Sequence, residues 1–148
     1  MPEKETLERA AEDKREGKAA STQAGEFVRE EVEHVREGKH GARSTKQAIA
    51  IGLSKARRAG VRLAAPKKGQ ASKKTRKQAA RDSRKGKSAS KGTKSAKRSR
   101  ATSRALKREG HSAASKKALS RQARSAAAKR SAASRSRSAK KAAATRKK

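Results

Sequence analysis

Lysine and arginine recur about every third residue in the C-terminal half of this chain, separated mostly by alanine, serine and glycine. Residues 67–148 contain 31 of these cations and 2 acids, a net charge of +29. Cations at this spacing can contact successive phosphates, and the small spacers let the backbone follow a groove. Each phosphate contact releases counterions, so such binding depends steeply on salt. The spacing predicts a polyanion-binding surface, because this charge exceeds what solubility requires.

The candidate phosphate-binding residues fall into two groups. The first belongs to a basic helix predicted within residues 45–59 and to the arginine that follows it. The second is spread along residues 67–148. The candidates are Lys46, Lys55, Arg57, Arg58, Arg62, Lys67, Lys68, Lys73, Lys74, Arg76, Lys77, Lys97, Arg98, Arg100, Lys116, Lys117, Arg121, Arg124, Lys129, Arg130, Lys140 and Lys141.

Contacts to the nucleic-acid backbone are favoured over recognition of base sequence. Residues 67–148 contain no Phe, Tyr or Trp to stack on bases, and no zinc-finger or RNP pattern is present. Two helices within residues 27–58 could resemble a helix-turn-helix, but the connection over residues 38–44 is long for that motif. We therefore predict non-sequence-specific DNA binding that could bridge or compact duplexes. The alternative is an RNA- or ribosome-associated protein.

Glu31 and His34 have the i, i+3 spacing of a carboxylate and an imidazole that bind one metal ion on a helix. A single pair on a glutamate-rich helix is more typical of solvated surface, and His40 follows in a polar loop. There is no cysteine for a thiolate site or a disulfide. The GKS at residues 86–88 lacks the upstream glycine of a phosphate-binding loop, because Arg81 stands there. We predict no metal, no cofactor and no enzymatic activity.

Three helices are predicted in the first half of the chain, over residues 5–16, 23–37 and 45–59. Serine or threonine stands near the start of each helix, and glycine follows the end of each. The expected N-caps are Thr6, Ser21 or Thr22, and Ser44 or Thr45, and the expected stops are Gly17, Gly38 and Gly60.

The second and third of these helices each have an apolar arc at 100° per residue. The arcs are Ala24, Phe27, Val28, Val32 and Val35, and then Ala48, Ile49, Gly52, Leu53 and Ala56. Gly52 and the alanines would let another helix approach closely. An acidic stripe opposite the first arc consists of Glu26, Glu30, Glu33 and Glu37. Glu31 intrudes on the apolar side, where a cation of the third helix could pair with it.

Large apolar residues are unevenly distributed along the chain. Leu, Ile, Val, Phe and Met number 11 in residues 1–65 and 2 in residues 66–148. Two such side chains cannot form a core, which predicts disorder in isolation with helix favoured on binding. The predicted fold is mostly α: a short module of two to three helices in residues 1–66, followed by a largely disordered, low-complexity basic tail in residues 67–148. A homodimer through the apolar strip of residues 27–56 is a further hypothesis.

Charge changes sign along the chain. Residues 1–38 contain 11 acids and 7 bases, while residues 39–66 contain 7 bases and no acid. The N-terminal residues contain no apolar run typical of a secretory signal or a membrane span. The two leucines of the tail are too few for a membrane-surface helix. We therefore expect a cytoplasmic protein located at the nucleoid, with no membrane partner.

A short block that joins a helix stop to a helix start occurs three times. The copies are REGKAASTQA at 15–24, REGKHGARSTKQA at 36–48 and REGHSAASKKALSRQAR at 108–124. The plain interpretation is repeated use of the same capping residues. The alternative is duplication of a helix–turn–helix unit, with the last copy degraded.

Two segments carry resemblances to known proteins. HGARSTKQAIAIGLSKARRAG at residues 40–60 resembles a core shared by a family of small, uncharacterised bacterial proteins, sometimes labelled DNA-binding, and the likeness extends over about residues 5–68. ALKREGHSAASKKALSRQARSAA at 105–127 is similar to a recurring block of that family. The remaining Lys- and Ala-rich sequence resembles the tails of linker histones and of bacterial histone-H1-like proteins, which implies DNA compaction by analogy.

Overall fold

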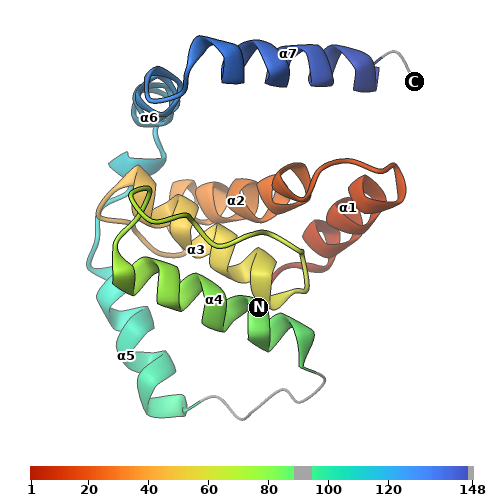
Figure 1. Cartoon of the computed structure of the whole chain (residues 1–148). Coiled ribbons are helices and arrows are strands. Elements are labelled where there is room, and N and C mark those ends of the chain that lie inside the picture. Colours follow the sequence, from red (N-terminus) through yellow and green to blue (C-terminus); the bar gives the residue numbers. More distant parts are fainter. Residues whose placement is uncertain (89–94, 147–148) are drawn as a thin grey trace.

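The computed structural model describes residues 1–88 and 95–146, which form seven α-helices and one 3-10 helix (Figure 1). Helices α1 to α4 pack together, whereas α7 lies outside that bundle (Figure 1). In chain order the elements are α1 (Lys4–Arg15), α2 (Ala20–Arg36), α3 (Thr45–Arg58), α4 (Lys73–Lys87), α5 (Ala96–Lys107), η1 (Ser112–Ala114), α6 (Lys116–Ala128) and α7 (Ala132–Arg146).

The three helices predicted in the first half are confirmed as α1, α2 and α3. The glycine stops are confirmed too, since Gly17, Gly38 and Gly60 have φ angles of 71°, 75° and 94°. The Ser44 side chain caps α3 by accepting a hydrogen bond from the Gln47 N–H at 3.2 Å.

The other two predicted N-caps are wrong. Thr6 lies inside α1, which begins after Glu3, and it is buried in the bundle. Helix α2 begins after Ala19 and has no side-chain cap. Both helices therefore start earlier than their serine or threonine residues indicate.

The interior consists of two clusters rich in alanine. One surrounds Phe27, which is 1% exposed, and the other surrounds Val35, which is fully buried. The first also contains Ala10, Ala24, Ala56, Leu53, Val61 and Leu63, and the second contains Val28, Val32, Ala42, Ala48, Ala113, Ala114 and Leu119. Much of the strip over residues 27–56 is thus covered within one chain, while the homodimer through it stays a prediction.

The interior forms with few large side chains because the helices approach one another closely enough for backbone atoms to be in contact. A Cβ atom on Gly52 would lie 2.7 Å from the Cα atom of Val28, so α2 and α3 touch there. This confirms the expectation that Gly52 permits a close helix approach. A Cβ on Gly41 would overlap the carbonyl of Glu109, and one on Gly86 would overlap the carbonyl of Arg57.

The predicted fold class is wrong for the second half of the chain. Residues 73–87, 96–107, 116–128 and 132–146 are helical, so the described part of the predicted tail is not a disordered segment. The prediction failed because it counted only large apolar residues as a source of packing. Alanine and glycine form the contacts instead. The boundary at residue 66 stays a prediction, and α4 and η1 both contact residues that precede it.

Asp82 fixes α4 on α3 by a set of hydrogen bonds. It is 1% exposed and accepts from Ser54 Oγ at 2.7 Å, Arg58 Nε at 2.8 Å and Gln78 Nε2 at 3.0 Å. Burial raises the pKa of this carboxyl, but the three donors outweigh burial and hold the pKa below its usual value. The charged carboxylate therefore stabilises the contact between the two helices.

Two of the three repeated blocks lie against each other. The loop that joins α2 to α3 meets the segment from Leu106 to Ala114 by backbone and side-chain hydrogen bonds. Two are backbone hydrogen bonds of 2.9 Å, from the Gly41 N–H to the Leu106 carbonyl and from the Ala42 N–H to the Gly110 carbonyl. At the ends of the loop, Thr45 Oγ1 donates to the Ala113 carbonyl at 2.7 Å and Arg36 Nε donates to the Ala114 carbonyl at 2.9 Å. His111 Nδ1 lies 2.9 Å from the Val35 carbonyl. Residues of the predicted tail thereby complete the second interior cluster.

The Gly52 contact predicts opposite effects for two glycines on neighbouring helices. Gly52→Ala should lower the free energy of unfolding by about 1–3 kcal/mol, because its Cβ meets the α2 backbone. Gly25→Ala is the matched control, since Gly25 lies in α2 with nothing within 4 Å of an added Cβ. It should raise stability by about 0.5–1 kcal/mol. Urea denaturation measures both, and equal stabilisation by the two variants would contradict the close approach.

The Asp82 hydrogen bonds predict a stability difference that depends on pH. Asp82→Asn should lose about 1.5–3 kcal/mol near neutral pH, where the native carboxylate is charged. Because the pKa of Asp82 is lowered, its contribution is present above the usual carboxyl pKa and is lost as pH falls through the lowered value. The native chain and the variant should therefore converge in acid.

Urea unfolding across this pH range checks the Asp82 prediction. Glu109→Gln is the control, since Glu109 is the other acid of residues 67–148 and makes no ion pair within the described part of the chain. A loss for Asp82→Asn that stays constant down to strongly acidic pH would contradict the assignment.

Candidate nucleic-acid interface

Helix α4 has one face that packs on α3 and an opposite, cationic face that is exposed to solvent. Ala79 and Asp82 are buried against α3. On the other side of the helix lie exposed cations, namely Lys73, Lys74, Lys77, Arg81, Arg84 and Lys85. The first three are among the sequence candidates, whereas Arg81, Arg84 and Lys85 are not. Treating residues 73–87 as a helix at 100° per residue would have placed these three on the same side as the sequence candidates. The prediction of disorder for this segment meant that no helical face was considered.

Helix α6 is divided in the same way. Leu119 and Gln122 are half-buried on the side that faces the bundle. Lys117, Arg121 and Arg124 are exposed and line one shallow hollow together with Ser120. We call these three cations the α6 face. At 1.5 Å rise per residue, Lys117 and Arg124 are about 10 Å apart along the axis.

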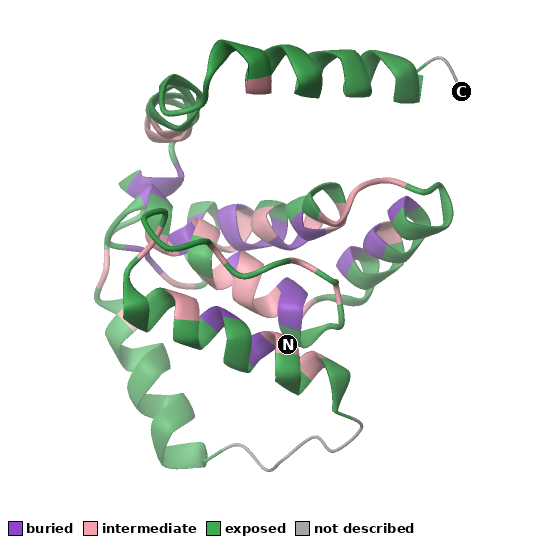
Figure 2. Ribbon diagram, viewed as in Figure 1, coloured by how far each residue is buried: buried purple, intermediate pink, exposed green. Residues whose placement is uncertain are grey.

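The remaining candidates beyond residue 66 are also at the surface. Figure 2 shows α5, α6 and α7 as almost entirely exposed. Lys67, Lys68, Lys97, Arg98, Arg100, Lys116, Lys129, Arg130, Lys140 and Lys141 are exposed, and Arg76 is half-buried. The structure does not gather all of them on one surface, because α7 lies outside the bundle (Figure 1).

Carboxylates are nearly absent from this part of the chain. The acids of residues 67–148 are Asp82 and Glu109, and Asp82 pairs with Arg58 of α3 at 2.8 Å. Within the described residues, no Lys or Arg beyond residue 66 forms an ion pair with a carboxylate. The positive charge of α4 to α7 therefore remains uncompensated by the protein itself.

Lys55, a predicted DNA contact, is half-buried and pairs with two glutamates of α2. Its Nζ atom is 2.9 Å from Glu30 Oε1 and 2.8 Å from Glu31 Oε2, and both glutamates are buried. Burial lowers the pKa of Lys55, but the two carboxylates raise it more, so the ammonium stays charged. This confirms that a cation of the third helix pairs with Glu31. Glu30, a member of the acidic stripe opposite the apolar arc, is nevertheless buried, and it accepts a hydrogen bond from the Glu3 N–H at 3.1 Å.

Arg57 and Arg58 are also used within the fold. Arg57 is 7% exposed, and its guanidinium donates to the carbonyls of Leu53, Leu63 and Ala64. Arg58 binds Asp82 as described above. Of the five candidates in and after the third helix, Lys46 and Arg62 are the two exposed residues without such a contact among the described residues.

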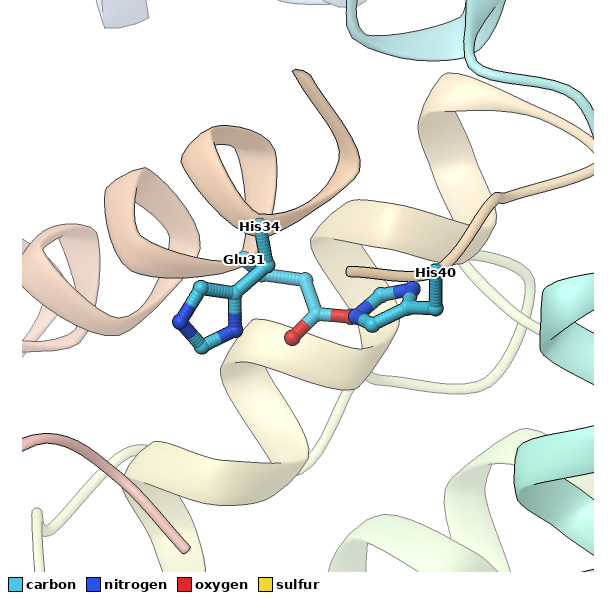
Figure 3. Close-up of side chains that lie close together, drawn as sticks. All are labelled: Glu31, His34 and His40. Carbon is cyan, nitrogen blue, oxygen red and sulfur yellow. The ribbon is translucent and has the colours of Figure 1, made fainter. Parts of the chain in front are cut away.

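A cluster of possible metal ligands lies beside Lys55. Glu31, His34 and His40 each place a ligand atom within 4.8 Å of the others (Figure 3). The interpretation of Glu31 and His34 as a solvated pair is wrong for Glu31, which is fully buried. Sequence spacing identified two members of this cluster, and the loop that follows α2 supplies the third.

Comparison with known proteins gives a family for one segment. Residues 13–69 match a family of unknown function (DUF6496). This segment covers the end of α1, then α2, α3 and the connection that follows, and it excludes α4 to α7. No curated protein and no solved structure matches the chain. Among the described residues, none of the helices has the length and apolar character needed to cross a bilayer.

Proposed function

We propose that this protein binds duplex DNA through the phosphate backbone with little sequence preference, as a nucleoid-associated protein of the histone-H1-like type. The observation that carries the proposal is the exposed, uncompensated positive charge of α4 to α7. Residues 67–148 have a net charge of +29, and within the described residues their cations have no carboxylate partners. A surface of this kind concentrates polyanions.

Helical order makes the contacts more regular than a flexible tail would. Lys117, Arg121 and Arg124 point from one side of α6, at axial positions separated by about 6 and 4.5 Å. Duplex DNA presents one charge per about 1.7 Å of its axis, so each long side chain reaches a phosphate without distortion of the helix. The exposed cations of α4 repeat this arrangement on a second helix.

The first half of the chain has a different part in this proposal. Many of its lysines and arginines are engaged with carboxylates and carbonyls, as at Lys55, Arg57 and Arg58. Residues 1–38 have a net charge of −4, with 11 acids against 7 bases. Helices α1 to α3 therefore support α4 and α6 and orient their cationic faces, while the affinity comes from residues beyond 66.

The α6 face predicts a change in the salt dependence of DNA binding. Replacing Lys117, Arg121 and Arg124 together by glutamine should reduce the slope of log affinity against log salt by about 2.7, at about 0.9 per lost phosphate contact. Fluorescence anisotropy on a duplex of mixed sequence, titrated over a range of NaCl concentrations, measures this slope. The replaced side chains are exposed, so the fold should be retained.

A matched variant separates the α6 face from net charge. Replacing Lys4, Lys14 and Arg15 by glutamine removes the same charge from exposed positions of α1. The salt slope of that variant should equal that of the native chain. Equal slopes for the two triple variants, or strong discrimination among duplex sequences by the native chain, would overturn the proposal.

The choice of DNA over RNA has its own test. Folded RNA offers the same phosphate charge, and the predicted alternative is an RNA- or ribosome-associated protein. We expect duplex DNA to displace a labelled DNA probe at least as well as a structured RNA of equal length at the same salt. Displacement by the RNA at a tenfold lower concentration would support the alternative.

A further inference from the structure

Three side chains from α2 and the loop that follows it converge at one point. Glu31 and His34 lie one turn apart on α2, and His40 turns back toward them from the loop (Figure 3). We propose that Glu31, His34 and His40 bind one transition-metal dication, and that zinc is the ion this donor set fits. The site is separate from the α6 face, so it does not depend on the proposed DNA binding.

The outer nitrogen of each ring already has an acceptor. His34 Nε2 lies 2.8 Å from Glu3 Oε1, and His40 Nδ1 lies 3.0 Å from the carbonyl of Gly41. Carboxylates and carbonyls only accept, so these nitrogens carry the ring protons. The inner nitrogens, His34 Nδ1 and His40 Nε2, then present lone pairs toward Glu31 (Figure 3). Metal-binding histidines are typically oriented by acceptors of this kind.

The Glu31 carboxylate is the second observation that indicates a cation. It is fully buried, and its Oε2 atom pairs with Lys55 at 2.8 Å. Its Oε1 atom accepts no hydrogen bond from the described residues and faces His40 Nε2 at 3.2 Å. A buried carboxylate oxygen beside two imidazole lone pairs is unfavourable unless a positive charge lies among them.

The ion pairs around the cluster contain more negative than positive charge. Two lysines each pair with two carboxylates here: Lys39 with Glu3 and Glu37, and Lys55 with Glu30 and Glu31. With neutral imidazoles this group has two more negative than positive charges. A bound dication would balance that excess.

The geometry suits a tetrahedral zinc ion with three protein ligands. Zinc lies about 2.0–2.1 Å from its nitrogen and oxygen ligands, which sets neighbouring ligand atoms about 3.3 Å apart. The 3.2 Å between Glu31 Oε1 and His40 Nε2 already fits this spacing. The side chains of His34 and His40 are 13% and 18% exposed, so water can reach the fourth position.

The donor types favour zinc over the alkaline-earth ions. Calcium and magnesium prefer oxygen ligands, while imidazole with carboxylate is typical of zinc and its neighbours in the first transition row. A bound ion would join α2 to the loop before α3, and Glu3 and Lys55 would extend this connection to α1 and α3. The expected role is therefore stabilisation of the bundle by zinc.

The experiment measures zinc binding to the full chain. Competition with a chromophoric chelator should show one high-affinity Zn²⁺ per chain, and thermal unfolding should shift upward when zinc is added. His34→Gln and His40→Gln should each weaken binding at least tenfold. Glu3→Ala should weaken it about 10- to 100-fold by removing the acceptor that orients His34. His111→Gln is the matched control, since His111 binds the Val35 carbonyl and lies outside the cluster.

A second measurement uses only the native chain, so its outcome does not depend on whether the variants fold. Cobalt(II) bound to the native chain at one equivalent should give the intense visible absorption of a tetrahedral site, and zinc should abolish it. The proposal is overturned if Zn²⁺ fails to bind at one equivalent, if cobalt shows only the weak octahedral spectrum, or if His111→Gln weakens binding as much as His40→Gln.

Discussion

The structure depends on how closely its helices can approach one another. With so few large apolar side chains, burial must come from backbone and Cβ surface, which requires helices in direct contact. Gly52 provides that contact between α2 and α3, and Gly86 and Gly41 provide it between the first and second halves of the chain. Alanines fill the space that remains, as Ala24, Ala48 and Ala56 do. A larger residue at any of the three glycines would force helices or loops apart.

Charged residues have two distinct uses in this molecule. Inside the bundle they act as packing partners, since Lys55 lies between Glu30 and Glu31 and Asp82 gathers donors from α3 and α4. Such buried charges are tolerated because each has an opposite charge or a hydrogen-bond donor close by. At the surface, the exposed cations of α4 to α7 have no acid to pair with among the described residues. The proposed DNA binding rests on that second group alone.

The proposed metal cluster lies near the point in the chain where the charge changes sign. It occupies the junction between the acidic residues 1–38 and the basic residues that follow. Burial of Glu31 beside Lys55 and two histidines concentrates charge there, and the same loop makes hydrogen bonds to the segment from Leu106 to Ala114. An ion at this junction would therefore influence both halves of the chain.

The amino-acid sequence by itself determined α1, α2 and α3, their glycine stops, the close approach at Gly52 and the pairing of Glu31 with a cation. These features follow from local periodicity, from backbone conformations that favour glycine and from the cost of an unpaired buried charge. It also placed the positive charge in residues 67–148. Only the tertiary structure decided that this segment is helical, because alanine and glycine contribute packing solely when another backbone lies against them.

The same limit applies to individual side chains. Lys55, Arg57 and Arg58 are indistinguishable in sequence from free surface cations, and only the structure shows that they bind Glu30, Leu63 and Asp82. Arg81, Arg84 and Lys85 joined the candidate surface once α4 had a defined solvent face. His40 joined Glu31 and His34 only when the loop turned back, since sequence spacing specifies neighbours on one helix and contacts between elements depend on how the chain packs.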